Sequence, residues 1–190
     1  MEYYGRHRDE QDGYIYSPII KQYDTSFWKT VSGSPAMAGN LLRFTSAIAA
    51  SFIQHIFADV ELLLTIPVKP TAGQARKWGF ILPDSDNMGG SYFEVNGAVF
   101  QAVTKDIYGN TQTTAITWDD TNWTAKAIKY RIKWEAEQVV YFVNDVIVAT
   151  HSVNTTDMIP NMALPIEISN GTADNLDMTY LAVRRAASII

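Results

Sequence analysis

Cysteine is absent from this chain of 190 residues, and charged residues are scarce. Without a thiol, the protein can form no disulfide bond and has no thiolate for catalysis or metal binding. Charged residues make up 18% of the sequence, against about a quarter in an average soluble domain. The formal net charge is −5, so we expect no basic surface and no nucleic-acid partner.

Apolar stretches long enough to cross a membrane are also missing. The longest candidates, residues 47–57 and 60–66, are interrupted by residues such as His55 and Glu61, whereas a spanning helix needs about 20 apolar residues. Residues 1–16 are polar and charged, where a secretory signal would have an apolar core. We therefore expect no membrane partner, and we discount the three Asn-x-Thr sequons, which matter only in a eukaryotic secretory pathway.

Alternation of apolar and polar residues is the clearest pattern that the chain does contain. Between residues 128 and 134, apolar residues alternate with basic ones, which predicts a strand with one buried and one solvated face. A short polar turn leads to a second strand at 139–143, rich in β-branched and aromatic residues. Asn144-Asp145 tolerates the positive φ of a tight turn and precedes a returning strand at 146–149. This window therefore predicts three antiparallel strands.

The residue pattern of these strands resembles that of a known family. The order Tyr-x-Ile-x-Trp, a short polar turn, then Val-x-Phe-Val-Asn-Asp-x-Ile-Val is similar to the back-sheet hairpins of the concanavalin A-like lectin/glucanase superfamily. In that superfamily Asp-Gly is common where this chain has Asn144-Asp145. The resemblance extends from about Leu41 to Arg185. It implies an all-β fold, an antiparallel two-sheet β-sandwich of jelly-roll type.

Turn signals divide the rest of the chain into short segments typical of a sandwich. Asn96-Gly97 is the strongest hairpin signal, between expected strands at 91–95 and 98–103. Residues 47–57 fit either a helix face or a strand, and we favour strand and loop. Other expected strands cover residues 23–31, 41–46, 60–66, 78–82, 163–168 and 176–185.

Residues 1–23 hold many tyrosines and isoleucines but show no sustained period. No pattern would bury these side chains within the segment, so we interpret it as an extended N-terminal arm that packs on another subunit. The remaining residues, 24–190, are expected to form the β-sandwich domain. Its expected partners are copies of itself and other subunits of a particle. The candidate assembly residues are Tyr3, Tyr4, Tyr14, Ile15, Tyr16, Ile19 and Ile20.

Carboxylates suited to glycoside hydrolysis are hard to find. Glucanases of the superfamily place them on alternate residues of one strand, as in Glu-x-Asp-x-Glu, and two of them flank the glycosidic bond. Here Asp59-x-Glu61 has the spacing for only two, and Glu94 stands alone between apolar neighbours. The three histidines lie in no recognised nucleophile motif. We therefore predict that the protein is not an enzyme and has no catalytic residues.

An acidic loop is the one candidate metal site. Asp84, Asp86 and Asn87 resemble the start of a calcium loop, although positions five and twelve lack oxygen ligands. Oxygen atoms of these residues would hold Ca²⁺. In the alternative interpretation they cap the turns of their own loop. We expect no cofactor, with Ca²⁺ as the alternative.

A second cluster suits carbohydrate. Aromatic rings stack on sugar faces, and Asp and Asn bind hydroxyl groups. Each tryptophan would alternatively plug the end of the sandwich or an intersubunit contact. The candidate carbohydrate-binding residues are Trp118, Asp119, Asp120, Asn122 and Trp123.

Three functions remain in order of preference. The first is a non-enzymatic structural subunit of a virion, such as a capsid-decorating protein of a phage or archaeal virus. The missing signal, cysteine and catalytic carboxylates, together with the tyrosine-rich arm, favour it. The second is a lectin-like glycan-binding module, extracellular or at a cell surface. The third is a divergent glycoside hydrolase.

Overall fold

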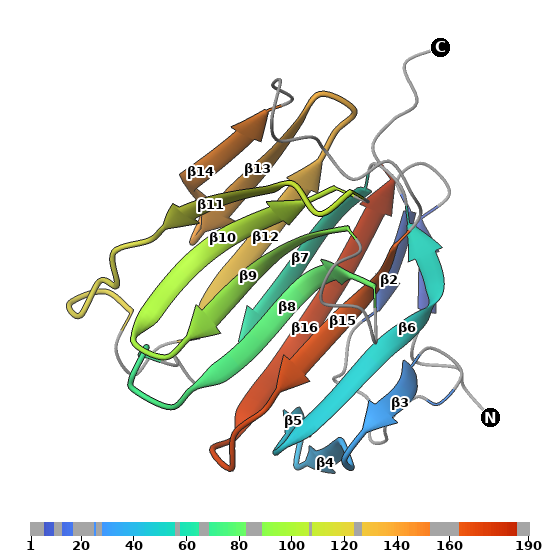
Figure 1. Ribbon diagram of the computed structural model, residues 1–190. Helices are drawn as coiled ribbons and strands as arrows, with labels where there is room; N and C mark the ends of the chain where they lie inside the picture. The colour runs from blue at the N-terminus through green and yellow to red at the C-terminus, as the bar shows by residue number, and fades with distance from the viewer. Residues whose placement is uncertain are drawn as a thin grey trace.

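The computed structural model of the protein consists of strands and connecting loops, with no α-helix among the residues that it describes (Figure 1). Within them, no helix is long and apolar enough to span a membrane. The described residues are 6–9, 13–16, 25, 28–55, 58–64, 69–82, 89–106, 108–123, 127–152 and 164–185.

One layer is a nine-stranded antiparallel sheet, which lies behind the other layer in Figure 1. Its strands are β1 (Arg6–Asp9), β2 (Gly13–Tyr16), β4 (Ala36–Ala38), β5 (Leu41–Phe44), β7 (Ala58–Leu64), β12 (Ile128–Trp134), β13 (Gln138–Val143), β14 (Val146–Ser152) and β16 (Leu176–Arg185). Their order is β1-β2-β16-β7-β12-β13-β14, with β5 beside β16 and β4 beside β5.

The other layer is a seven-stranded antiparallel sheet, in front in Figure 1. Its strands are β3 (Trp28–Ser32), β6 (Ala47–His55), β8 (Ala75–Ile81), β9 (Gly90–Asn96), β10 (Val99–Lys105), β11 (Thr111–Ala115) and β15 (Leu164–Asn170). Their order is β11-β10-β9-β8-β15-β6-β3. β15, which comes near the end of the sequence, thus lies between β8 and β6. The predicted all-β, two-sheet sandwich of jelly-roll type is confirmed.

The core lies between the two sheets and is rich in aromatic rings. Burial alternates along β12, so the predicted inward face of this strand is confirmed. The Tyr130 ring lies 4.9 Å from that of Trp78, and the Trp134 ring 5.3 Å from that of Phe80. Each pair joins a strand of one sheet to a strand of the other, so aromatic packing holds the two layers together.

The two predicted hairpin turns are present. Asn144 and Asp145 have φ values of 49° and 66°, and Gly97 has a φ of 59°. These left-handed conformations match the right-handed twist of the flanking strands. The side-chain oxygen of Asn144 also accepts a hydrogen bond from the Lys129 backbone N–H, at 3.0 Å. The ambiguous stretch forms β6 as far as His55, and residues 56–57 lie outside the described part.

The N-terminal segment finds a partner in its own chain. β1 pairs with β2, and β2 pairs with β16, so both strands extend the nine-stranded sheet. We expected this segment to pack on another subunit. In the structure, the backbone of β2 instead pairs with β16 of the same chain. A role in assembly stays a prediction. Tyr14, Ile15 and Tyr16 lie opposite Val183, Ala182 and Leu181, whereas Tyr3, Tyr4, Ile19 and Ile20 lie outside the described residues.

Candidate functional site

The outer face of the seven-stranded sheet carries a carboxylate near its middle. On β9, Phe93 and Val95 are buried in the core between the sheets. Because successive side chains of a strand point to opposite faces, Tyr92, Glu94 and Asn96 lie on the outer face. This strand therefore presents one carboxylate among three alternate positions, where the superfamily's catalytic strand has three.

Glu94 is held by side chains from both neighbouring strands. Gln101 on β10 lies directly opposite it, and its side-chain nitrogen donates to Glu94 Oε2 at 2.5 Å. Lys77 on β8 lies opposite on the other side, with Nζ 3.6 Å from Glu94 Oε1. The Glu94 side chain is 14% exposed and that of Lys77 31%. The carboxylate is thus oriented by a neutral donor and a cation while keeping some contact with solvent.

The outer face of the seven-stranded sheet has an apolar part as well as a polar one. Ile81, Tyr92 and Val103 form a small buried apolar cluster, separate from the main core. The Lys77 ammonium lies 5.6 Å from the centroid of the Tyr92 ring, within the range of a cation–π contact. Glu94 therefore lies at the border between a buried apolar part of this face and a more open polar part.

Gly79 on β8 lies between two outer-face residues of the neighbouring strands. It lies opposite Tyr92 on one side and opposite Glu167 of β15 on the other. Its φ is 146°, and an added Cβ would come within 2.6 Å of the Ser91 carbonyl oxygen, so glycine is required here. The sequence analysis did not place Glu167 on this face, because nothing in the sequence indicates that β15 pairs with β8.

The other carboxylate pair considered for catalysis lies on the far side of the sandwich. Val60 is buried in the core, so Asp59 and Glu61 lie on the outer face of the nine-stranded sheet. Arg131 donates to both oxygens of Asp59, at 2.9 Å to Oδ1 and 2.5 Å to Oδ2. The Arg131 guanidinium therefore binds Asp59 as a structural ion pair.

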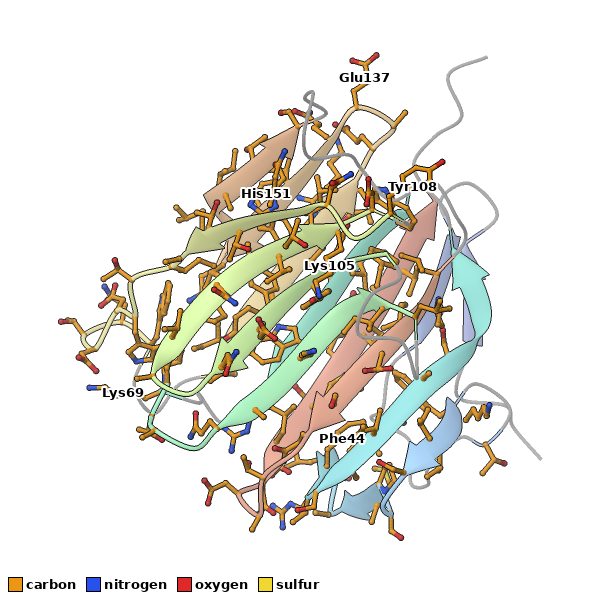
Figure 2. The ribbon with its side chains drawn as sticks, in the orientation of Figure 1. Phe44, Lys69, Lys105, Tyr108, Glu137 and His151 are labelled. Atoms are coloured by element: carbon orange, nitrogen blue, oxygen red, sulfur yellow. The ribbon has the colours of Figure 1, made fainter. Side chains whose placement is uncertain are left out.

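His151 is a packing residue between the sheets. It is 3% exposed, and its ring nitrogens lie 2.7 Å from Thr104 Oγ1 and 3.0 Å from Thr114 Oγ1. The Tyr141 ring lies 5.1 Å away, and the Tyr141 hydroxyl donates to the Val103 carbonyl at 2.6 Å. These contacts join β14 to β10 and β11 at one edge of the sandwich (Figure 2).

The predicted sugar-binding tryptophans pack on the core. The Trp118 and Trp123 rings lie 5.3 Å apart and nearly perpendicular. Phe100, which is buried, lies 6.0 Å from Trp118 and 6.3 Å from Trp123. Both rings are partly buried against the core, in accordance with the alternative that they plug the end of the sandwich.

The polar members of that cluster hold their own loop. Asp119 Oδ1 accepts from the backbone N–H groups of Thr121 and Asn122, and Oδ2 accepts from the Asn122 side chain at 2.7 Å. Asp120 forms an exposed ion pair with Lys69, with the two atoms 2.7 Å apart. The structure thus brings the five candidates together, and their binding of carbohydrate stays a prediction.

The candidate calcium ligands Asp84, Asp86 and Asn87 lie outside the described residues. Among the residues that are described, no group of three or more metal-binding side chains occurs. Calcium binding therefore stays a prediction for the acidic loop.

The strand order and the packing of the two sheets define a jelly-roll β-sandwich. Residues 69–182 match the sequence profile described as "Glycosyl hydrolases family 16". This match spans more than half of the chain, and the protein therefore belongs to that family. No curated protein sequence matches this chain.

Solved structures confirm the fold. An apo Crh5 transglycosylase superposes with a TM-score of 0.72 at 14% identity, covering 92% of this chain and 84% of that one. The catalytic domain of a laminarinase, an endo-1,3-β-glucanase from Thermotoga petrophila RKU-1, gives 0.70 at 9% identity over 94% and 98%. A Bacillus licheniformis β-glucanase gives 0.64 at 12% identity over 97% and 100%. The predicted resemblance to concanavalin A-like proteins is confirmed.

The family corrects the predicted function. We predicted a non-enzymatic virion subunit, and membership of a glycosyl hydrolase family contradicts both parts of that prediction. The prediction rested on the absence of a carboxylate triplet within one strand. Such a pattern shows which residues of a strand share a face, but not which other strands bring carboxylates to that face.

Proposed function

We propose that the protein is a glycoside hydrolase that acts on a β-glucan at the outer face of the seven-stranded sheet. The observation that carries this proposal is the position of Glu94 on that face in a chain of glycosyl hydrolase family 16. A laminarinase and a β-glucanase among the similar structures support a β-glucan as substrate.

Glu94 has the surroundings that a reacting carboxylate needs. Gln101 and Lys77 fix its oxygens from two sides, and a fixed orientation lowers the entropy lost in reaching the transition state. The side chain retains some exposure, so a sugar ring bound on this face can reach it. The positive charge of Lys77 also lies close to the Glu94 carboxylate and interacts favourably with its negative charge.

The polar row around Glu94 suits an extended chain of sugars. Cross-strand register aligns Gln101, Glu94, Lys77 and Ser169 on four adjacent strands. With neighbouring strands about 4.8 Å apart, this row is about 14 Å long. It therefore offers amide, carboxylate, ammonium and hydroxyl groups to more than one sugar ring, as an endo-acting enzyme requires.

The experiment compares turnover of laminarin and lichenan by three proteins. We expect wild type to release reducing ends, and Glu94→Gln to lose at least about 100-fold in kcat, the scale of a lost acid–base group. Glu61→Gln is the matched control, because Glu61 lies on the other sheet. Turnover that survives Glu94→Gln contradicts the proposal, and so does glycan binding without any turnover.

A further inference from the structure

β11 forms one edge of the seven-stranded sheet, and within the described part of the chain it pairs with β10 alone. The Ile116 backbone N–H donates to the Phe100 carbonyl at 2.8 Å, and the Asp106 N–H donates to the Asn110 carbonyl at 3.0 Å. Bonded and non-bonded pairs alternate along an antiparallel ladder. Counting along the register between these two bonds shows which backbone groups of β11 point away from β10. They belong to Thr111, Thr113 and Ala115.

β11 has neither a charged residue nor a bulge. Its sequence is TQTTA, and its register with β10 is unbroken. The strands at the opposite edges of the two sheets are different, because β1 has the sequence RHRD and β3 contains Lys29. Charged side chains and bulges on an edge strand oppose pairing with another chain. β11 is therefore an edge that can accept a further strand.

The edge of the other sheet lies beside β11, on the same side of the sandwich (Figure 1). Thr104 Oγ1 on β10 lies 2.6 Å from the Tyr141 hydroxyl on β13, and Thr114 Oγ1 on β11 lies 3.0 Å from His151 Nε2 on β14. Since β10 thus lies over β13 and β11 over β14, the two edges are flush and β14 leaves the edge of β11 open. The pairing of β14 with β13 contains a register shift next to Tyr141, so β11 is the more regular edge.

The open edge of β11 is complementary to itself. A two-fold axis through Thr113 sets this residue against its counterpart in a second copy, and sets Thr111 against Ala115 on both sides. Each of these pairs exchanges two backbone hydrogen bonds, so every outward N–H and C=O group of the strand is paired. No like charges meet in this register, and Thr opposite Thr is a favourable cross-strand pair.

We propose that the protein forms a two-fold symmetric dimer in which β11 of one copy pairs antiparallel with β11 of the other. The occupant of the edge is a second copy of this chain, because the register that satisfies every outward group is symmetric about Thr113. The two seven-stranded sheets then form one continuous sheet, with their outer faces on the same side. Closed two-fold symmetry is the commonest arrangement of soluble oligomers. The dimer does not depend on the proposed function.

Sedimentation equilibrium of the full chain tests the dimer, with Thr113→Pro as the disrupting variant. Proline removes the outward N–H of this residue in both copies but removes no bond to β10, so each copy should keep its fold. Loss of the two hydrogen bonds should raise the dissociation constant by at least about tenfold. Thr113→Val keeps the N–H and the β-branched shape, and as the matched control it should dimerise like the wild type.

Charged variants test the position of the axis. Because Thr113 is exposed and faces its own counterpart, Thr113→Lys and Thr113→Glu should each be monomeric alone, with like charges directly opposite. An equimolar mixture of the two should recover dimers that contain one copy of each, as measured by native mass spectrometry. This recovery distinguishes a residue on the axis from one elsewhere in an interface.

Three results would overturn the proposal. They are a wild type that sediments as a monomer from micromolar to millimolar concentration, a dimer that Thr113→Pro leaves unchanged, and a mixture of the charged variants that stays monomeric. Circular dichroism checks that each variant is folded. If Thr113→Pro fails to fold, the charged variants decide the question, because they change only an exposed side chain.

Discussion

Arg43 and Asp177 lie directly opposite each other on β5 and β16 and form two parallel hydrogen bonds. Arg43 Nε donates to Asp177 Oδ1 at 2.8 Å, and its terminal nitrogen donates to Oδ2 at 2.7 Å. Asp177 has no exposed surface. This fork-to-fork pairing fixes β5 against β16.

The first prediction concerns that pair. Arg43→Met should lower the melting temperature more than the double variant Arg43→Met/Asp177→Leu, because the single change leaves a buried carboxylate without its cation. A double-mutant cycle by thermal denaturation measures the difference. If the effects of Arg43→Met and Asp177→Leu, measured separately, simply add in the double variant, the two residues are not energetically coupled.

The second prediction concerns pH. Two hydrogen bonds lower the pKa of Glu135 in the folded protein. The one from Lys133 has the larger effect, and the one from Gln138 has the smaller. Because the folded pKa is depressed, the stabilisation is present above the unfolded pKa and is lost as the pH falls through the folded one. Glu135→Gln should therefore be destabilising at pH 7 but not at pH 2. Urea denaturation at both values checks this, and an equal effect at both would contradict it.

The third prediction concerns the core. Trp134 is fully buried and packs on Phe80 of the opposite sheet. Trp134→Ala should leave a cavity and reduce the free energy of unfolding by about 3–5 kcal/mol. Trp134→Phe, which keeps an aromatic ring, is the matched control and should cost less. A loss below about 1 kcal/mol for the alanine variant in denaturant would show that this contact does not hold the sheets together.

The fourth prediction separates two roles for the tryptophan pair. If Trp118 and Trp123 form a sugar platform, then Trp118→Ala abolishes glycan binding and leaves the melting temperature unchanged. Because both rings pack on Phe100, we expect the reverse: a lower melting temperature with binding retained. Calorimetry and binding to a glycan array on the same samples distinguish the outcomes.

Short-range features of this protein follow from the sequence. The alternation along 128–134 specifies which face of β12 is buried, and the Asn96-Gly97 and Asn144-Asp145 turns specify two hairpins. These features depend on strand period and on the φ values that a residue tolerates, which are local properties. For the same reason the all-β class was predictable.

The composition of the candidate site depended on the tertiary structure. Glu94 was visible in the sequence, but Lys77 and Ser169 lie level with it only because β8 pairs with both β9 and β15. Pairing between strands far apart in sequence is decided by the closing of the whole sandwich around one core, and no local pattern encodes it. The sequence by itself determined which residues could face outward, whereas the order of the strands decided which of them meet.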